Sequence, residues 1–238
     1  MKQVRLYQNT TFNIGKKLAL DEYAKHHLIK VLRFPKGQEV ILFNGDGYDY
    51  LARVVEVKKQ CIVEVLTHEK NLSESKLDLT LAQGIAKGEK MDFLIQKAVE
   101  LGVNRIIPIV SERVVVRLKA DKVKRRQAHW QQIAIHAAEQ SGRSVVPKVE
   151  VPTKLDTLLD HQTSCGFVLH HRAEKTLKQI DACQSAIVLI GPEGGFSDNE
   201  INQATEANYL PLLLGKRVLR TETASLAAIA NMQLLWGS

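Results

Sequence analysis

Two glycine-bounded loops near the end of the chain carry the residue types from which a ligand site could be built. Each follows a short apolar run, at 186–190 and at 210–214, that stops at a glycine. The first loop reads GPEGGFS over 191–197, and the second reads GKRVLRTET over 215–223. Such runs, when helical patterns follow them, are typical of buried parallel strands with ligand loops at their carboxyl ends. We therefore expect one site built from both loops.

The first loop is unusually rich in glycine, which permits left-handed backbone conformations and lets the main chain approach a ligand closely. It is not a phosphate-binding P-loop, because no lysine follows the glycines, and its spacing is not that of the dinucleotide-binding fingerprint. Ser197 and Glu200 form the pattern of a capping box, so a helix should begin there. The simpler alternative is a tight connection between a strand and a helix.

The second loop carries more chemistry. Arg220 and Glu222 flank a threonine just before an apolar helical pattern. Thr223 is the expected N-cap of that helix, which leaves backbone N–H groups free to meet an acceptor. The simpler alternative is a local ion pair between Arg220 and Glu222, beside a solvated turn at Lys216 and Arg217.

Composition and charge narrow the class of protein. The 238 residues are 45% hydrophobic, and no apolar run approaches the roughly 20 residues of a membrane span. The first ten residues lack the apolar core of a signal peptide. The three cysteines (Cys61, Cys165 and Cys183) lie far apart, which predicts free thiols in a reducing compartment and neither a disulfide frame nor a structural zinc. We expect a cytoplasmic protein.

The formal net charge of +7 favours a polyanionic partner. Residues 1–72 hold 12 Lys and Arg against 8 Asp and Glu, and residues 119–126 hold a second basic cluster. Such clusters are also found on plain solvated faces, so charge by itself leaves a nucleic-acid partner open.

The pattern of elements changes along the chain. Strands are expected at 4–7, 39–43, 50–57 and 61–66, with one helix at 21–32 that Asp21 could cap. Many short strands with one helix suggest a small closed or half-closed barrel. After the polar break at 71–76, strands are expected at 77–83, 105–110, 165–169, 186–190 and 210–214, with helices at 91–101, 121–141, 197–207 and 223–235. This alternation predicts an α/β domain with a parallel sheet.

Several motifs together resemble one family. The stretches IGPEGGFS (190–197) and LLLGKRVLRTETA (212–224) resemble the SPOUT class of S-adenosyl-L-methionine-dependent RNA methyltransferases. More narrowly, the chain is similar to the RsmE family, which methylates N3 of one uridine in the decoding region of 16S rRNA. His27 with Val31-Leu32-Arg33, the KAVELGV stretch at 97–103 and AEQSGR at 138–143 also match that family's pattern, with His136 as a minor departure.

The resemblance implies a domain organisation that the pattern alone does not show. Residues 1–72 would form a PUA-like RNA-binding β-barrel domain, and 73–238 a mostly parallel α/β methyltransferase domain with a deep trefoil knot. Such domains act as homodimers, with a partner subunit lining part of each pocket. The cofactor would be S-adenosyl-L-methionine, bent within the knot, and the partner would be 16S rRNA or the small ribosomal subunit.

The same resemblance implies the site residues. The cofactor would be held by Leu169, His170, Ile190, Gly191, Pro192, Glu193, Gly194, Leu214, Gly215, Val218, Leu219, Arg220, Thr223 and Ala224. RNA contacts would come from Arg5, His27, Lys30, Arg33, Arg113, Arg117, Lys124 and Arg125. Arg220 and Glu222 are the expected catalytic residues.

The bond formed between the methyl group and uridine N3 indicates what Arg220 and Glu222 should do. Uridine N3 is a poor nucleophile until it loses its proton, and the resulting anion spreads onto O2 and O4. Arg220 presents a planar fork of donors to such oxygens and cannot itself be the base, since it stays protonated. Glu222 would orient Arg220 or the cofactor. The sequence does not identify the general base.

Other interpretations remain to be weighed. The same class of enzyme could act on tRNA, on 23S rRNA or on a ribose 2′-OH, since the fold is shared. The chain could also be an RNA-binding assembly factor without catalysis. The Ser73-x-x-Lys76 pattern lacks the companion motifs of a serine hydrolase. Adjacent histidines at 26–27 and 170–171 cannot chelate as one pair on a strand, so no metal site is expected.

Overall fold

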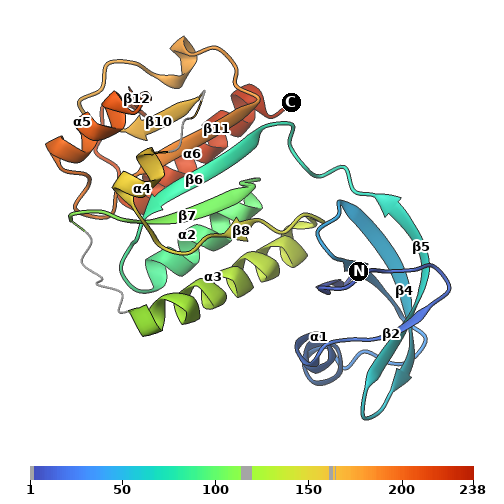
Figure 1. Ribbon diagram of the computed structural model, residues 1–238. Coiled ribbons are helices and arrows are strands. Elements are labelled where there is room, and N and C mark those ends of the chain that lie inside the picture. The colour runs from blue at the N-terminus through green and yellow to red at the C-terminus, as the bar shows by residue number, and fades with distance from the viewer. Residues whose placement is uncertain (1–2, 114–119, 161–162, 164) are drawn as a thin grey trace. The chain divides into compact units, whose positions relative to one another are not determined.

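The computed structural model describes residues 3–113, 120–160, 163 and 165–238, and the chain divides into two compact units (Figure 1). Unit 1 comprises Met1–Glu74 and Ala138–Val146, and unit 2 comprises Ser75–Ala137 and Pro147–Ser238. The sequence-based domain limits, 1–72 and 73–238, stay a prediction. The contacts differ from them in two respects: unit 1 extends to Glu74, and residues 138–146 pack with unit 1.

Unit 1 is built on a β-sheet. Its strands are β1 (Arg5–Tyr7), β2 (Lys17–Ala19), β3 (Glu39–Phe43), β4 (Tyr48–Val57) and β5 (Cys61–Lys70). In the described part of unit 1 they form a five-stranded sheet in the order β1-β3-β4-β5-β2, in which only β1 and β3 run parallel. The hairpin expected at β4 and β5 is confirmed. β2, only three residues long, was not predicted.

The helical segment of unit 1 changes its winding partway along. α1 (Glu22–His26) begins as expected, because the Asp21 carboxylate accepts the Ala24 N–H at 2.7 Å. The chain then continues as a π-helix, η1 (His27–Val31). The helical segment expected over 21–32 is therefore confirmed, but its second half winds as a π-helix. Buried side chains of the helices and the sheet form one core: Leu6, Phe12, Leu20, Ala24, Leu28, Val40, Leu42, Ala52, Val54, Cys61, Val63 and Val65.

Unit 2 is organised around a parallel sheet. Its strands are β6 (Asp78–Gly84), β7 (Arg105–Val110), β8 (Lys148–Val149), β9 (Thr153–Lys154), β10 (Gly166–Leu169), β11 (Ser185–Ile190) and β12 (Tyr209–Leu212). Among the described residues the order is β12-β10-β11-β6-β7-β8, with β9 also paired to β7, and every pair is parallel. The α/β prediction is confirmed; the knot that the resemblance implies stays a prediction.

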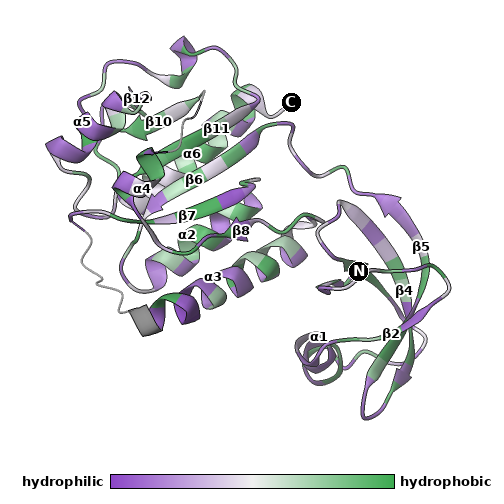
Figure 2. Cartoon of the chain, in the orientation of Figure 1, coloured by the Kyte–Doolittle hydropathy of each residue, from purple (hydrophilic) through white to green (hydrophobic). Residues whose placement is uncertain are grey.

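Helices cover both faces of this sheet (Figure 1). They are α2 (Glu89–Glu100), α3 (Ala120–Ser141), α4 (Leu155–Leu159), α5 (Asp198–Glu206) and α6 (Thr221–Trp236), with a short 3-10 turn η2 (Leu177–Gln179). α4 and α5 pack on the face that presents Ala82, Ile107 and Leu189. α6 packs against β11 and α2, on the opposite face. Figure 2 shows β10 and β11 as mostly hydrophobic and α5 as largely hydrophilic, as expected for a buried sheet under a surface helix.

The strand order decides which loops meet. β10 lies between β11 and β12, and β6 lies on the other side of β11. The chain leaves all four strands at the same carboxyl edge, because they are parallel. β11 and β12, which lead into the two glycine-bounded loops, are therefore not neighbours in the sheet. The segment that follows β10 starts between them.

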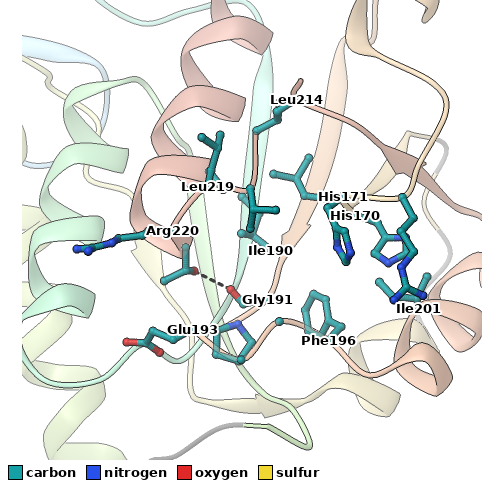
Figure 3. Close-up of a pocket in the computed structure, with 18 of the residues that line it drawn as sticks. His170, His171, Ile190, Gly191, Glu193, Phe196, Ile201, Leu214, Leu219 and Arg220 are labelled. Carbon is teal, nitrogen blue, oxygen red and sulfur yellow. Dashed lines mark hydrogen bonds between the residues drawn. The ribbon is translucent and has the colours of Figure 1, made fainter. Parts of the chain in front are cut away.

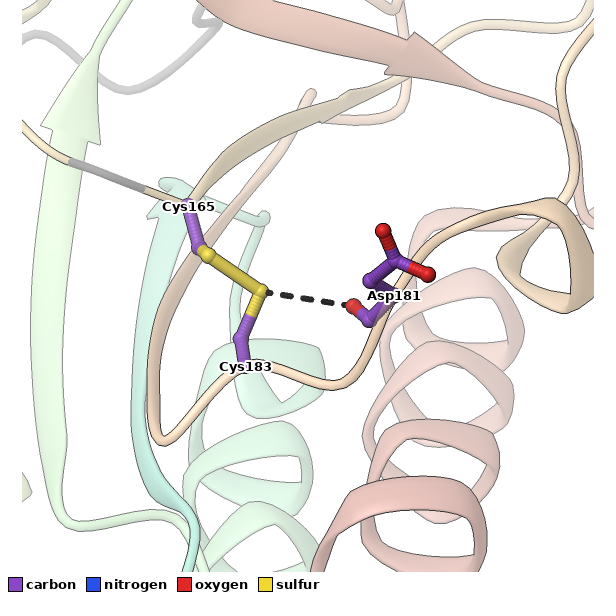
Figure 4. The surroundings of a disulfide bond; sticks show 3 residues. All are labelled: Cys165, Asp181 and Cys183. Atoms are coloured by element: carbon purple, nitrogen blue, oxygen red, sulfur yellow. Dashed lines mark hydrogen bonds between the residues drawn. A yellow bond between two sulfur atoms is a disulfide. The ribbon is translucent and has the colours of Figure 1, made fainter.

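The cysteines correct one sequence prediction. Cys165 and Cys183 form a disulfide with their Cα atoms 6.5 Å apart (Figure 4), whereas Cys61 is a free, buried thiol. The two bonded cysteines precede β10 and β11, which are adjacent parallel strands, so they start side by side although 18 residues separate them. The expectation of free thiols was wrong, because cysteine spacing does not reveal strand adjacency. No helix in the described part of the chain is long and apolar enough to cross a membrane.

Candidate functional site

A cavity of about 600 Å³ opens at the carboxyl edge of the sheet of unit 2 (Figure 3). Its walls come from the segments that follow β10, β11 and β12, and from the start of α6. Loops at this edge of a parallel sheet are the usual place for a ligand in such folds. The cavity thus joins the two glycine-bounded loops with a third segment, 169–172, between them.

Glycine is required where the first loop meets β6. A Cβ added at Gly84 would lie 2.5 Å from both the Cδ and the N atom of Pro192, so no side chain fits between the strand and the loop. A Cβ at Gly191 would lie 3.0 Å from Gly195, which itself has a left-handed φ of +66°. The loop is therefore compact, with backbone and not side chains facing its interior.

Neighbouring polar groups hold this loop from outside. The Arg113 guanidinium donates to the carbonyl oxygens of Gly194 (3.1 Å) and Phe196 (3.3 Å). The Lys87 N–H donates to the Glu193 carboxylate at 3.0 Å. The capping box expected at the end of the loop is confirmed, since the Ser197 hydroxyl accepts the Glu200 N–H at 3.1 Å. These bonds make the loop a preformed wall of the cavity.

The second loop leads into α6, and the helix begins earlier than expected. Its first residue is Thr221, and its N-cap is Arg220, so Thr223 is not the cap. The Thr221 hydroxyl donates to the Gly191 carbonyl oxygen at 2.6 Å, which connects the start of α6 to the first loop. The sequence could not reveal this, because a threonine that bonds to a distant loop looks the same as one before a cap.

Arg220 and Glu222 do not pair with each other. The Arg220 side chain is exposed, and it makes no ion pair or hydrogen bond within the described residues. Glu222 lies 3.9 Å from the Lys90 ammonium, and Lys90 lies 3.8 Å from Glu193. The second carboxylate oxygen of Glu222 is buried and has no hydrogen-bond partner among the described groups. The local ion pair considered for this loop is therefore absent from the structure.

Histidines line the other end of the cavity. Figure 3 shows Arg220 and Glu193 at one end, and His170 and His171 at the opposite end. Burial lowers the pKa of His170, and the charges of His171 and Arg172 lower it further, so its ring is neutral near pH 7. The rings of His170 and His171 are 5.0 Å apart, and no metal-ligating cluster occurs in the part of the chain that the structure describes.

The structure brings all but one of the expected cofactor residues together. All of them except Thr223 line the cavity. Several lining residues were not expected from the sequence: Lys90, His171, Arg172, Phe196, Asp198, Ile201, Arg217 and Thr221. Lys90, at the start of α2, could have been considered from its place just after a strand–helix connection, but nothing local marks it as part of this cavity.

The expected RNA-contact residues are more dispersed. Arg5 does not fit that role, because its guanidinium is paired to Asp49 at 2.6 Å and is 11% exposed. Arg113 is committed to the glycine loop, and Arg117 lies outside the described residues. The others are available on the surface of their units: Lys30, Arg33, Lys124 and Arg125 are exposed, and the half-buried His27 stacks on Tyr23.

The chain is similar to known RNA methyltransferases along its length. A family described as RNA methyltransferase domain matches residues 73–233, and one described as RNA methyltransferase PUA domain matches residues 20–66. The "Ribosomal RNA small subunit methyltransferase E" of Buchnera aphidicola subsp. Schizaphis graminum is 34% identical over 245 residues, which cover 98% of this chain and 96% of that protein.

Solved structures agree with these matches. A Legionella pneumophila protein in complex with the bound cofactor SAM is 37% identical, with a TM-score of 0.97 and full coverage of both chains. A ribosomal RNA small subunit methyltransferase E from Neisseria gonorrhoeae, bound to S-adenosyl methionine, is 40% identical, with a TM-score of 0.93 and coverage of 99% and 98%.

The two matched domains define an RNA methyltransferase that carries a PUA domain. The extent and identity of the matches narrow this class further. The chain belongs to the ribosomal RNA small subunit methyltransferase E family.

Proposed function

We propose that this protein transfers a methyl group from S-adenosyl-L-methionine to N3 of one uridine in 16S rRNA of the small ribosomal subunit. The observation that carries the proposal is the preformed cavity of unit 2, because two relatives with TM-scores of 0.93 and above were solved with this cofactor. A cytoplasmic location follows from the proposed substrate.

The residues of the cavity fit this cofactor. Gly191 and Gly194 expose backbone where a Cβ would contact Gly195 or Arg113, so the main chain is free to bond an adenine. Ile190, Leu214 and Leu219 supply apolar wall for the base and the ribose. The cavity therefore combines apolar wall residues with charged side chains, among them Lys90, Arg172 and Arg220.

Glu222 lies beside the cavity and is not among the residues that line it. One carboxylate oxygen lies 3.9 Å from Lys90, while the other is buried without a partner. A buried, unpaired carboxylate oxygen is costly unless a donor reaches it, and an ammonium group is such a donor. Lys90 carries such a group and lines the cavity, so Glu222 would orient the cofactor through Lys90.

Arg220 is the group that would act on the uridine. When bound, S-adenosyl-L-methionine supplies an electrophilic methyl group on a sulfonium. The Arg220 guanidinium, which has no competing partner in the described structure, would donate to O2 or O4 of the base and stabilise the anion formed when N3 loses its proton. The rest of the site mainly positions the two reactants, which is a large part of any in-line transfer.

The surface of unit 2 favours a homodimer. α6 is apolar on all sides, yet Leu234 is 77% exposed and Leu235 is 45% exposed near its end. Phe93, on the neighbouring helix α2, is 46% exposed. Since helices that are apolar all round are normally buried, we propose that a second copy of the chain covers these residues.

A transfer assay tests the function directly. Labelled S-adenosyl-L-methionine is incubated with unmodified small subunits, naked 16S rRNA and tRNA, and the label is then mapped to a base position. We expect label at one uridine N3 of 16S rRNA. Label that appears only in tRNA, or at a ribose 2′-OH, would refute the assignment. Calorimetric titration that finds no cofactor binding would instead favour the assembly factor.

A further inference from the structure

A buried polar group lies directly beneath the cavity and belongs to none of the expected motifs. Gln83 is the penultimate residue of β6, and its side chain is completely buried. The strand is otherwise apolar where it is buried, at Leu79, Leu81 and Ala82. An amide in such a position must find partners for both its donors and its acceptor.

Gln83 finds those partners in three different segments. Its Nε2 donates to the Thr221 hydroxyl oxygen at 3.0 Å and to the Gly84 carbonyl oxygen at 2.9 Å, and it lies 3.5 Å from the Gly191 carbonyl oxygen. Its Oε1 lies 2.6 Å from the Ser225 hydroxyl, which can donate to it. The acceptors around Nε2 and the donor at Oε1 define the orientation of the amide.

The bonds continue from Gln83 into the walls of the cavity. Thr221, which accepts from Gln83, donates to the Gly191 carbonyl oxygen at 2.6 Å. Gly191 opens the glycine loop, and Thr221 is the residue that follows Arg220. Ser225 lies one turn further along α6, 2.8 Å from the Thr221 carbonyl oxygen. Thr221 is 6% exposed and Ser225 is completely buried.

We propose that Gln83 is a positioning residue that fixes the glycine loop and the first turn of α6 relative to each other. It acts through Thr221 and Ser225 and touches neither substrate nor cofactor. Its loss would let the two loops separate by a fraction of an ångström, which displaces Arg220 from the loop that opens at Gly191. This inference rests on the proposed function of the cavity.

Gln83→Leu removes all the polar contacts and keeps a side chain of similar size. We expect its dissociation constant for S-adenosyl-L-methionine to rise about tenfold or more and its kcat to fall further, because small misplacements cost large factors in rate. Circular dichroism and thermal unfolding establish that the variant is folded at the assay temperature.

Gln83→Glu supplies a readout that a merely structural residue would not move. The carboxylate has no donor for the Gly84 and Gly191 carbonyl oxygens, whereas the protonated acid has one. The rate of this variant relative to the wild type should therefore rise severalfold as the pH is lowered, since burial favours the protonated acid. A constant ratio across the pH range would contradict the inference.

Two serines form a matched pair of controls. Ser225 in unit 2 and Ser144 in unit 1 are both completely buried and hydrogen-bonded through their hydroxyls. Both substitutions should lower the melting temperature by a comparable amount. Ser225→Ala should also weaken cofactor binding severalfold, whereas Ser144→Ala should leave cofactor binding unchanged. This pair decides the matter if Gln83→Leu does not fold.

The failure of this inference differs from the failure of the proposed function. If the wild type binds cofactor and methylates RNA, and the Gln83 and Ser225 variants do so equally well, only the positioning role is overturned. If the wild type itself binds no S-adenosyl-L-methionine, the proposed function is wrong and the positioning role falls with it.

Discussion

Each unit contains a buried polar cluster, and the two clusters differ in charge. In unit 1, Arg5 donates to both carboxylate oxygens of Asp49, at 2.6 and 2.7 Å, and to the Ser144 hydroxyl at 2.8 Å. In unit 2, Gln83, Thr221 and Ser225 form a neutral cluster beneath the cavity. No residue of the charged cluster lines the cavity of unit 2, whereas Thr221 of the neutral cluster does.

The two clusters have different roles. The charged cluster joins β1 and β4 to residues 143–144, which lie far away in sequence, so it serves the integrity of unit 1. Burial raises the pKa of Asp49, but hydrogen bonds from Arg5, Ser144 and Asn71 outweigh this and hold the pKa below its usual value. Neutral amides and hydroxyls can orient two loops without the desolvation that a buried charge requires.

The largest expected effect breaks the charged cluster. Asp49→Ala leaves the Arg5 guanidinium buried without its anion and should lower the free energy of unfolding by about 3–5 kcal/mol. The measurement is urea denaturation at pH 7, with cofactor binding of the folded protein as the second readout. The substitution should leave cofactor binding unchanged. A variant that is fully folded but no longer binds the cofactor would contradict the view that this cluster serves only unit 1. The wild-type stability that Asp49 contributes should fade only at acid pH, as pH falls through its lowered pKa.

Arg220→Ala tests the cavity of unit 2. It should reduce kcat by about 10²–10³ while cofactor binding is retained, because its guanidinium acts on the charge of the reacting base. Steady-state kinetics and calorimetry separate the two quantities. Arg105→Ala is the control, since Arg105 is 52% exposed and lies at the amino end of β7, away from the cavity. Turnover at the wild-type rate would remove Arg220 from the mechanism.

The disulfide should stabilise unit 2 independently of the polar cluster formed by Gln83, Thr221 and Ser225. Cys183→Ser opens the loop of 18 residues closed by Cys165 and should lower the stability of the oxidised protein by about 3 kcal/mol. Thermal unfolding with and without dithiothreitol measures this, and the reductant should reproduce the effect in the wild type. Cys61→Ser serves as the control, because the Cys61 thiol is free. The thermal unfolding of this variant should be as sensitive to dithiothreitol as that of the wild type. A wild type that is indifferent to dithiothreitol would contradict the disulfide.

The smallest expected effect concerns Glu139 in unit 1. Burial raises the pKa of Glu139 to about 7. The negative charge of Asp21 also raises this pKa, whereas the hydrogen bond that the Tyr7 N–H donates to the carboxylate lowers it. The folded protein therefore binds more protons than the unfolded chain between its ordinary pKa and about 7, so stability falls as pH rises through that window. Glu139→Gln should lack this decline and gain about 1–2 kcal/mol over the wild type at pH 8.

Urea denaturation at several pH values between 5 and 8 tests this prediction. Glu69→Gln is the control, because that side chain is exposed and its substitution should not change the slope. A wild type and a Glu139→Gln variant with parallel pH dependences would show that Glu139 is ionised in the folded protein.

Most element types in this chain could be predicted because their signals are local. The capping box at Ser197, the end of the helix expected at 91–101, just before Gly102 with its φ of +91°, and the strand at Arg105–Val110 all appear where the sequence indicates them. The very short strands β2, β8 and β9 were missed, since two or three residues carry no period. The π-helical turn after His26 was also missed, because helical periodicity does not distinguish the two windings.

The two ligand loops, the α/β pattern and, through its motifs, the family could all be inferred from the sequence. The folded chain alone reveals that β10 lies between the strands leading into those loops, that Cys165 meets Cys183, and that Gln83 reaches Thr221 and Ser225. The physical reason is the range of the forces involved. Turns, caps and hydrophobic periods depend on residues a few positions apart, whereas strand order and buried hydrogen bonds depend on partners brought together only when the whole sheet is packed.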